Sequence, residues 1–291
     1  MLPHTGPRAR GGVLLQAKSR HAGGCGGNME EIEHVVRKPA NRVHQTPILL
    51  LHGAWHGAWC WENWLGHFSS MGYEVHAFSL PAHGTSSCRK GHVNFYTLGD
   101  YVNTLAAQVA QISPTPVVVG HSMGGAILQK YLESNALPGA VLLATAPASG
   151  IFGMVLRLMR RHPVAICKGL LTLNLYHWVA TEELARDLFL GSATSPSDVR
   201  KLHRQLVRET TTLPQLFFPF AKLNKTSTPT IVLAAEKDVI FTLAEERATA
   251  ERYGAECIAF EGQAHDLMLE PAWPQVANTI DEWITSKLKL P

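Results

Sequence analysis

The sequence predicts an α/β fold, in which a mostly parallel β-sheet is flanked by helices and carries an inserted helical cap. Three observations support this prediction. From about residue 31, apolar runs of strand length alternate with segments of helical periodicity, as in repeated strand–helix–strand units. The runs are apolar at consecutive positions, for example "ILLL" at residues 48–51, which is typical of strands buried on both faces. The alternation stops at about residues 148–227, which look helical throughout.

The strand-like segments end in turn-forming residues or run into a helical segment. The expected strands lie at residues 33–38, 46–53, 73–81, 115–122, 139–147, 228–238 and 255–262. The expected helices lie at residues 59–72, 97–112, 123–134, 242–254 and 271–288. Thr97 or Asp100 is expected to cap the start of the second helix, and Gly72 to end the first.

Composition narrows the class of protein and its partners. The 291 residues are 46% hydrophobic, enough for a soluble globular protein with a large core. The net charge is only +3 and no long basic block is present, so we expect no nucleic-acid partner. The five cysteines are widely spaced without a C-x-x-C pair, which favours free thiols in a reducing compartment and a cytoplasmic location.

Two segments raise the question of targeting or membrane insertion. Residues 1–28 are basic, rich in glycine and free of acidic residues. We interpret residues 1–30 as a disordered extension before a single domain at residues 31–291; an organelle transit peptide and a true start at Met29 are the alternatives. Residues 134–156 carry no charge, but their prolines and glycines favour a buried strand followed by a loop, so no stable membrane insertion is expected.

The segment "VVVGHSMGGAILQKY" carries the chemistry. A β-branched strand enters Gly120-His121-Ser122-Met123-Gly124, and a helical pattern follows. G-x-S-x-G at a strand-to-helix turn exposes the serine hydroxyl, and the glycines leave room for the strained backbone. Ser122 is therefore the candidate nucleophile. The start of the new helix directs its dipole and the Met123 N–H toward the negative charge that develops on the substrate.

A serine nucleophile needs a base and an acid that orients the base. Asp238 follows the strand-like run "TIVLAA", and His265 follows the next strand. Both therefore lie at the carboxyl ends of strands, at the same edge of the sheet as Ser122. We predict a triad of Ser122, Asp238 and His265; Glu236 and Asp266 are the rival acids, Asp266 the weaker because adjacent side chains point apart.

The oxyanion needs two donors, and the loop after residues 48–51 supplies the second. Gly53 lets the backbone turn so that the Ala54 N–H points to the same place as the Met123 N–H, and these two amides are the predicted oxyanion hole. His52 and His56 do not share a helical face, and no third ligand is evident, so no metal is expected. His52 and His83 are expected to brace loops at the rim, and His121 to pack or hydrogen-bond.

These motifs resemble the α/β-hydrolase superfamily over roughly residues 31–147 and 228–290. "HGAWHGAWCWENW" is similar to the loop of the plant methylesterase and hydroxynitrile-lyase group and related bacterial esterases. The resemblance implies Ser122 as nucleophile, His265 as base, Asp238 as its partner, and Ala54 and Met123 as oxyanion donors. It also argues against the lyase branch, which commonly has threonine at Gly53 and lysine at Asp266.

The predicted activity is a serine hydrolase that cleaves a carboxylic ester through an acyl-enzyme, without a metal or organic cofactor. A C–C bond hydrolase, a thioesterase, a perhydrolase and a hydrolase-fold small-molecule binding protein are the alternatives. Apolar residues of the cap are expected to hold an apolar portion of the ester, or to pack the cap onto the body. They are Phe152, Met154, Leu158, Met159, Leu170, Leu175, Trp178, Phe217, Phe218 and Phe220.

Basic residues of the cap allow two readings. A solvated helix face is the expected role, and contact with an anionic substrate or a lipid surface is the alternative. These residues are Arg157, Arg160, Arg161 and Lys168.

Overall fold

The computed structural model describes residues 14–20, 30–209, 213–217, 219, 221–222 and 226–290. Its centre is an eight-stranded sheet in the order β1-β2-β4-β3-β5-β6-β7-β8. The strands are β1 (Leu14–Arg20), β2 (Glu31–Arg37), β3 (Ile48–Leu51), β4 (Val75–Phe78), β5 (Val117–His121), β6 (Ala140–Leu143), β7 (Thr230–Ala235) and β8 (Glu256–Phe260). Only the pairings of β2 with β1 and β4 are antiparallel. The predicted mostly parallel sheet is confirmed.

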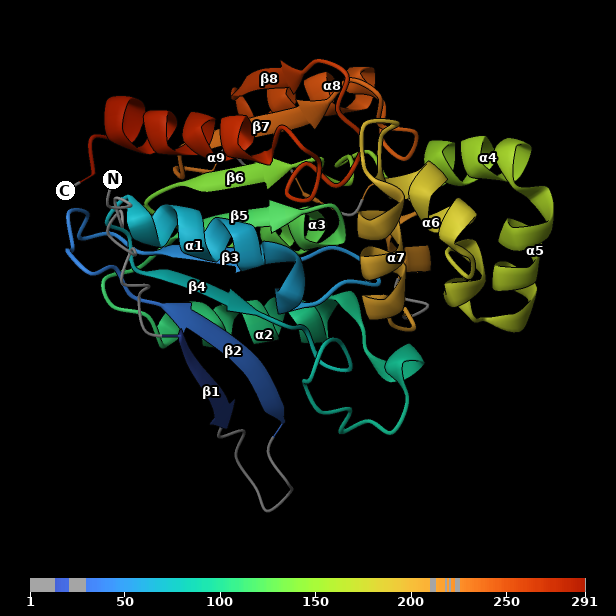
Figure 1. The fold of residues 1–291 in the computed structure, drawn as a ribbon, viewed down its shortest axis with the longest axis horizontal. Coiled ribbons are helices and arrows are strands. Elements are labelled where there is room, and N and C mark those ends of the chain that lie inside the picture. The colour runs from blue at the N-terminus through green and yellow to red at the C-terminus, as the bar shows by residue number, and fades with distance from the viewer. Residues whose placement is uncertain are drawn as a thin grey trace, which may run out of the picture.

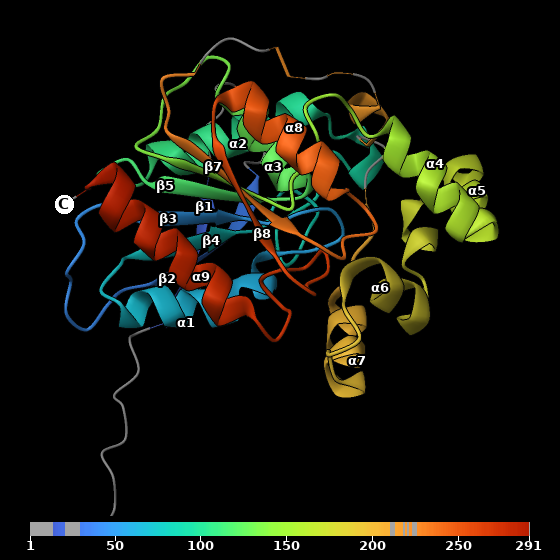
Figure 2. The ribbon, with the colours of Figure 1, turned by 90° about the horizontal axis from the view of Figure 1, so that it is seen from above.

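Helices cover both faces of the sheet (Figures 1 and 2). The helices α1 (Glu62–Ser70) and α9 (Trp273–Glu282) lie on one face, and α2 (Leu98–Ala110), α3 (Met123–Tyr131) and α8 (Leu243–Tyr253) on the other. Strand side chains alternate between two buried cores. Ile48 and Leu50 pack in the core of the α1–α9 face, whereas Leu49 and Leu51 pack in the opposite one. Because both faces of the sheet are buried, β3 is apolar at every position.

Local signals in the sequence explain where helices start and stop. Thr97 accepts a hydrogen bond from the Asp100 N–H, and Asp100 bonds back to the Thr97 N–H, so both predicted capping residues act together in one capping box. A short 3-10 helix, Ala58–Trp61, precedes α1. Gly72 follows α1 with a φ of +100°, a backbone conformation that favours glycine.

Helices between β6 and β7 gather at the carboxyl ends of the parallel strands, toward which the arrowheads of β5 and β6 point in Figure 1. They are α4 (Phe152–Arg161), α5 (Pro163–Thr172), the 3-10 helix Leu175–Trp178, α6 (Glu182–Phe189), α7 (Pro196–Gln205) and the short turn Leu213–Leu216. The uncharged stretch at residues 134–156 contains β6, a loop and the start of α4, as predicted. Among the described residues, no helix has the length and apolar character needed to cross a bilayer.

The N-terminal segment differs from its prediction where the structure describes it. Residues 14–20 form the edge strand β1, whose seven residues pair antiparallel with β2, instead of a disordered extension. Without β1, the strand β2 would be the edge of the sheet and would leave a row of N–H and C=O groups unpaired. Pairing with β1 satisfies these groups. The rest of the predicted extension, apart from Glu30, lies outside the described residues.

Candidate active site

Ser122 stands at the turn from β5 into α3 in a strained conformation, with φ +53° and ψ −116°. Its hydroxyl forms no capping bond with the helix that follows, so it is available for chemistry. Gly120 is required for space: a Cβ atom there would lie 2.7 Å from the carbonyl oxygen of Gly124. The turn therefore has the geometry that the G-x-S-x-G spacing predicts.

Gly53 lies directly against Ser122, the candidate nucleophile. A Cβ atom at Gly53 would lie 2.8 Å from the Cβ of Ser122 and 2.9 Å from Nδ1 of His121. Any side chain there would have to displace Ser122 or His121. The loop after β3 can approach Ser122 this closely only because residue 53 is glycine.

His52 fixes the orientation of the peptide that carries the Ala54 N–H. Its Nε2 accepts a hydrogen bond from the Leu80 N–H at 2.9 Å, so Nδ1 carries the proton and donates to the Gly53 carbonyl at 2.7 Å. Burial and the nearby His83 hold the pKa of His52 well below its usual range, which keeps the ring neutral. His52 thus braces the loop, as predicted.

Asp238 and His265 form a buried pair. Nδ1 of His265 lies 2.7 Å from Oδ2 of Asp238. The other carboxylate oxygen of Asp238 accepts the N–H groups of Ile240 at 2.7 Å and Phe241 at 3.1 Å. Both oxygens of Asp238 are therefore used, and the Nε2 edge of His265 is left for a proton transfer. Of the three candidate acids, Asp238 is the one that bonds to His265.

Aromatic rings surround His265 on three sides. Its ring centroid lies 4.8 Å from that of His121, 5.6 Å from Phe241 and 6.1 Å from Phe189. His121 also donates from Nε2 to the His265 carbonyl at 3.2 Å. Because His121 directly precedes Ser122, this contact holds the backbone of His265 beside the turn that carries Ser122.

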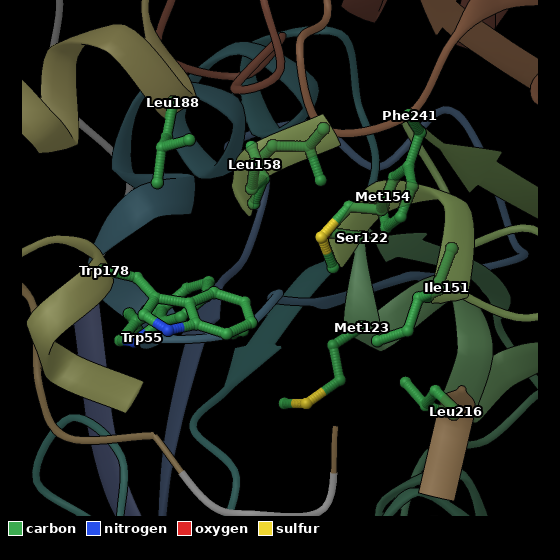
Figure 3. Close-up of a pocket in the computed structure, with 13 residues that line it drawn as sticks. Trp55, Ser122, Met123, Ile151, Met154, Leu158, Trp178, Leu188, Leu216 and Phe241 are labelled. Atoms are coloured by element: carbon green, nitrogen blue, oxygen red, sulfur yellow. The ribbon is translucent and has the colours of Figure 1, made fainter. Parts of the chain in front are cut away.

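A cavity lies between this turn and the cap (Figure 3). Its lining is apolar apart from the Ser122 hydroxyl. Both predicted oxyanion residues, Ala54 and Met123, line it. Trp55 and Trp178 form one wall, with ring centroids 6.1 Å apart. The other lining residues are Ala146, Ile151, Met154, Leu158, Leu188, Leu216, Ile240 and Phe241.

The described cap residues among those predicted to form a substrate pocket divide into three groups. Met154, Leu158 and Trp178 line the cavity. Phe152 is 55% exposed, so its predicted place in a pocket is wrong; it lies on the face of α4 opposite Met154 and Leu158. Met159, Leu170, Leu175 and Phe217 pack in the core instead. Phe218 and Phe220 lie outside the described residues.

Of the four basic cap residues predicted to form a solvated face, two pair with carboxylates and two are exposed. Arg157 donates to both carboxylate oxygens of Glu245 and to the Ile240 carbonyl, and it thereby ties α4 to α8. Arg161 pairs with Asp187 of α6. Arg160 and Lys168 are exposed.

Asp266 follows His265 in the chain but pairs with another histidine, His56. Its Oδ2 lies 3.0 Å from Nε2 of His56, whose Nδ1 lies 2.7 Å from the Ala54 carbonyl. Burial opposes a charge on His56, but the Asp266 carboxylate outweighs it through charge and a hydrogen bond, and raises the pKa of His56. Burial and the nearby His265 hold the pKa of His121 well below its usual range.

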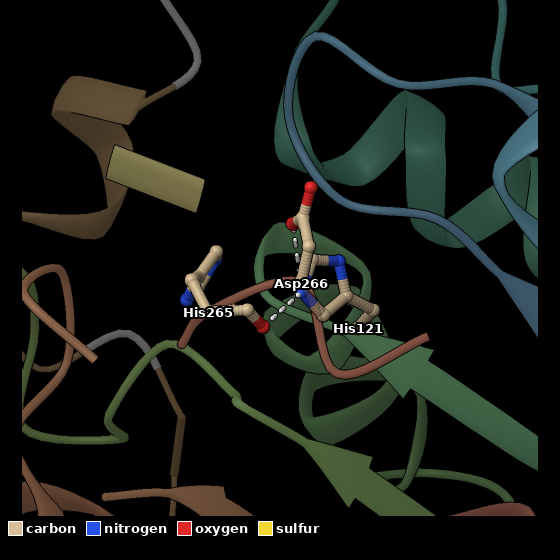
Figure 4. A group of neighbouring side chains, drawn as sticks. All are labelled: His121, His265 and Asp266. Atoms are coloured by element: carbon tan, nitrogen blue, oxygen red, sulfur yellow. Dashed lines mark hydrogen bonds and ion pairs between the residues drawn. The ribbon is translucent and has the colours of Figure 1, made fainter. Parts of the chain in front are cut away.

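Three buried groups, His121, His265 and Asp266, have potential ligand atoms within 4.8 Å of one another (Figure 4). Each of them already has a protein partner: His121 bonds to the His265 carbonyl, His265 to Asp238, and Asp266 to His56. The arrangement is that of a hydrogen-bonded network that ties the loop of His265 to the turn at Ser122. His52 and His56, the other histidines considered for a metal, bond to backbone groups and to Asp266 as described above.

Sequence patterns did not indicate two further charged groups near the cavity. Glu209 of the cap reaches the Trp55 N–H, and His56 and Asp266 pair across 210 residues. Glu209 also contacts His83 of "LPAHGTSS", which is fully buried and therefore needs a polar partner. This histidine was the signal in the sequence that could have pointed to Glu209.

Comparisons with known proteins agree with this architecture. The profile of the alpha/beta hydrolase family matches residues 48–278. Norfluorocurarine synthase 1 of Strychnos nux-vomica is 40% identical over 127 residues, which are 40% of this chain and 46% of that protein. Methylesterase 4 of Arabidopsis thaliana is 32% identical over 97 residues, 32% of this chain and 35% of that one. The matched segments thus span less than half of either relative.

Among solved structures, an esterase from Exiguobacterium antarcticum superposes with a TM-score of 0.69 at 15% identity, covering 89% of this chain and 97% of that one. This likeness shows the shared fold. The family profile covers most of the sheet, the turn at Ser122 and the strand ends that carry Asp238 and His265. The chain belongs to the alpha/beta hydrolase family.

Proposed function

We propose that the protein is a serine hydrolase that cleaves a carboxylic ester through an acyl-enzyme on Ser122, His265 and Asp238. The observation that carries the proposal is the buried His265–Asp238 pair, with Nδ1 and Oδ2 2.7 Å apart, beside an apolar cavity lined by Ser122 and both candidate oxyanion donors. This combination supplies a nucleophile, an oriented base and a place for the oxyanion.

The reaction takes two steps. The Ser122 oxygen attacks the carbonyl carbon while His265 Nε2 takes its proton, and the carbonyl π electrons move to the oxygen. The amides of Ala54 and Met123 bind this oxyanion. When the tetrahedral intermediate collapses, the C–O bond to the alcohol breaks and His265 returns the proton to the leaving alkoxide. Water then attacks the acyl-enzyme with His265 as base, and the acid and free Ser122 are released.

The cavity favours a small ester with an apolar portion. Apart from Ser122 its lining consists of apolar residues, as is usual for small-molecule sites. No charged side chain is among its lining residues, so an ionic group on the buried part of the substrate would lose its hydration without compensation.

Two features disfavour a lyase on the same fold. The space at Gly53 is filled by Ser122 and His121, which leaves no room for the threonine of the lyases. Asp266 is held by His56 and is buried, so it offers no cation for a cyanide leaving group.

Labelling and turnover test the proposal. The folded protein should react with a fluorophosphonate at Ser122 and hydrolyse p-nitrophenyl esters of graded chain length, and Ser122→Ala should lose both activities. Turnover of thioesters, peracid formation or C–C cleavage above ester hydrolysis would favour another chemistry on the same triad. Labelling without turnover would favour a binding protein, and folded protein that does not label would overturn the proposal.

A further inference from the structure

A short strap of the cap, residues 206–209 after α7, lies on the loop that carries the Ala54 amide. The strap binds Trp55 at both of its backbone groups. The Val207 N–H donates to the Trp55 carbonyl at 3.0 Å, and the Trp55 N–H donates to Oε2 of Glu209 at 2.8 Å. Trp55 has a φ of +62°, which is strained for a bulky residue and persists only where its surroundings fix it.

Glu209 is a buried carboxylate with a buried cationic partner. Nε2 of His83 lies 3.0 Å from Glu209 Oε2, and Nδ1 of His83 lies 3.0 Å from the Pro81 carbonyl. Because both ring nitrogens face acceptors, the geometry suits a doubly protonated imidazolium. Burial opposes this charge, but Glu209 outweighs it and raises the pKa of His83. The carboxylate and the ring that pairs with it are both buried.

Two neighbouring peptide units of the loop are thereby fixed in orientation. The Ala54 carbonyl and the Trp55 N–H belong to one unit, held by His56 at the oxygen and by Glu209 at the nitrogen. The unit before it is held at the Gly53 carbonyl by His52. The Ala54 N–H points opposite to that carbonyl, because a trans peptide directs the two groups to opposite sides.

We infer that Glu209, held by His83, is a positioning residue of the oxyanion hole. Its bond to the Trp55 N–H stops the Ala54–Trp55 peptide from rotating, and the oxyanion hole is complete only when the strap is seated on Trp55. Glu209 acts through the backbone and does not touch the reacting atoms. The inference rests on the proposed ester hydrolysis, since it assigns a role in stabilising that oxyanion.

The cap therefore has a task besides enclosing substrate. Trp55 lines the cavity with its ring, which also donates from Nε1 to the Leu175 carbonyl at 3.2 Å. Cap residues thus hold both the side chain and the backbone of Trp55. Displacement of the cap would release the Ala54–Trp55 peptide together with the cavity wall.

The decisive variants are Glu209→Ala, which removes the acceptor, and Glu209→Gln, which keeps an oxygen but removes the charge. The readouts are kcat and KM for a p-nitrophenyl ester, and inhibition by an alkyl trifluoromethyl ketone and its methyl ketone analogue. Only the fluorinated ketone readily forms a tetrahedral adduct whose oxygen needs the oxyanion hole. Arg208→Ala, an exposed neighbour on the same strap, is the matched control.

We expect Glu209→Ala to lower kcat about 10- to 100-fold with KM changed less than about threefold, because the interaction is made in the transition state. Affinity for the trifluoromethyl ketone should fall by the same factor as kcat/KM, whereas affinity for the methyl ketone should hold. The loss of kcat should be smaller in Glu209→Gln than in Glu209→Ala. The kcat and KM of Arg208→Ala should match those of the wild type.

A merely structural role for Glu209 would weaken both ketones alike, and that result would overturn the inference. Wild-type kcat in folded Glu209→Ala would overturn it too. If Glu209→Ala does not fold, Glu209→Gln and His83→Gln carry the test, and wild-type kcat in both is the contradicting outcome. Wild-type protein without Ser122-dependent hydrolysis would overturn the proposed function and this inference together; normal wild-type hydrolysis with an indifferent Glu209 overturns the inference alone.

Discussion

Nε2 of His56 lies 3.0 Å from Oδ2 of Asp266, and both side chains are completely buried. This pair joins the loop of the Ala54 amide to the residue next to His265, so two parts of the site that are distant in sequence are held together. Asp266→Asn would leave His56 without its counter-ion, and breaking a buried pair in this way typically costs about 3–5 kcal/mol. Urea unfolding should show such a loss, together with reduced kcat.

The control for Asp266→Asn is the double variant His56→Gln/Asp266→Asn. Because neither partner is then left as an isolated buried charge, the double variant should lose less free energy of unfolding than the sum of the two single variants. A strictly additive result would mean that the pair is not coupled.

Asp238→Asn should leave the fold intact and lower kcat about 10³- to 10⁴-fold. The asparagine oxygen can still accept the N–H groups of Ile240 and Phe241, but the amide would face Nδ1 of His265 and force the wrong tautomer. Glu236→Gln, at the exposed rival acid in the same loop, is the control and should keep wild-type kcat. Equal losses in the two variants would remove Asp238 from the triad.

Stability should decline as the solution becomes acidic, because of His52 and His121. Burial lowers the pKa of both rings, so below pH about 6.5 the unfolded chain binds protons that the folded chain does not. The free energy of unfolding therefore falls as pH decreases, by at most about 1.4 kcal/mol per pH unit for each ring. His121→Asn should show a shallower decline than the wild type in unfolding curves at pH 7, 6 and 5, and parallel curves would contradict this account.

Gly53→Ala should lower kcat by at least about tenfold, since the added Cβ would lie 2.8 Å from the Cβ of Ser122 and must shift the nucleophile. Steady-state kinetics and fluorophosphonate labelling rates measure the effect. The control is Gly66→Ala in α1, where the nearest atom to a new Cβ is 3.9 Å away. That change should leave kcat alone and add up to about 1 kcal/mol of stability, because alanine favours a helix. An unchanged labelling rate in Gly53→Ala would contradict this prediction, because it would show that the loop can move away from Ser122 to make room for the added Cβ.

Leu158→Phe should restrict the acyl chain that the cavity accepts. Leu158 faces the cavity, and the added bulk should lower kcat/KM for longer p-nitrophenyl esters at least about tenfold relative to the acetate. Leu156→Phe, on the outer face of the same helix and 40% exposed, should keep the wild-type chain-length profile. Identical profiles for both variants would mean that acyl chains lie elsewhere.

The candidate triad could be proposed from the sequence because its members follow three separate strands of a parallel sheet. Parallel strands end at one edge, so the positions of Ser122, Asp238 and His265 after apolar runs are enough to propose them as a triad, and His265 does bond to Asp238. The Glu209–His83 contact was not predictable in this way. It depends on where the strap crosses the sheet edge, and nothing in local periodicity sets the path of the cap.

Helical periodicity also left the pocket side of α4 undecided. Met154 and Leu158 are four residues apart and share a face, as do Phe152 and Leu156, so two apolar faces compete. The structure turns the first pair inward and exposes the second. Likewise β1 was missed because pairing along a sheet edge depends on a distant partner strand and not on the segment itself.

Trp55 contributes its ring to the cavity wall and its backbone to the frame of the oxyanion loop. Efforts to broaden the range of accepted molecules by trimming this tryptophan would therefore also impair turnover, as an unintended side effect. Engineers who want new selectivity without slower chemistry should start at Leu188 or Leu158, which shape the same space from helices that have no part in that frame.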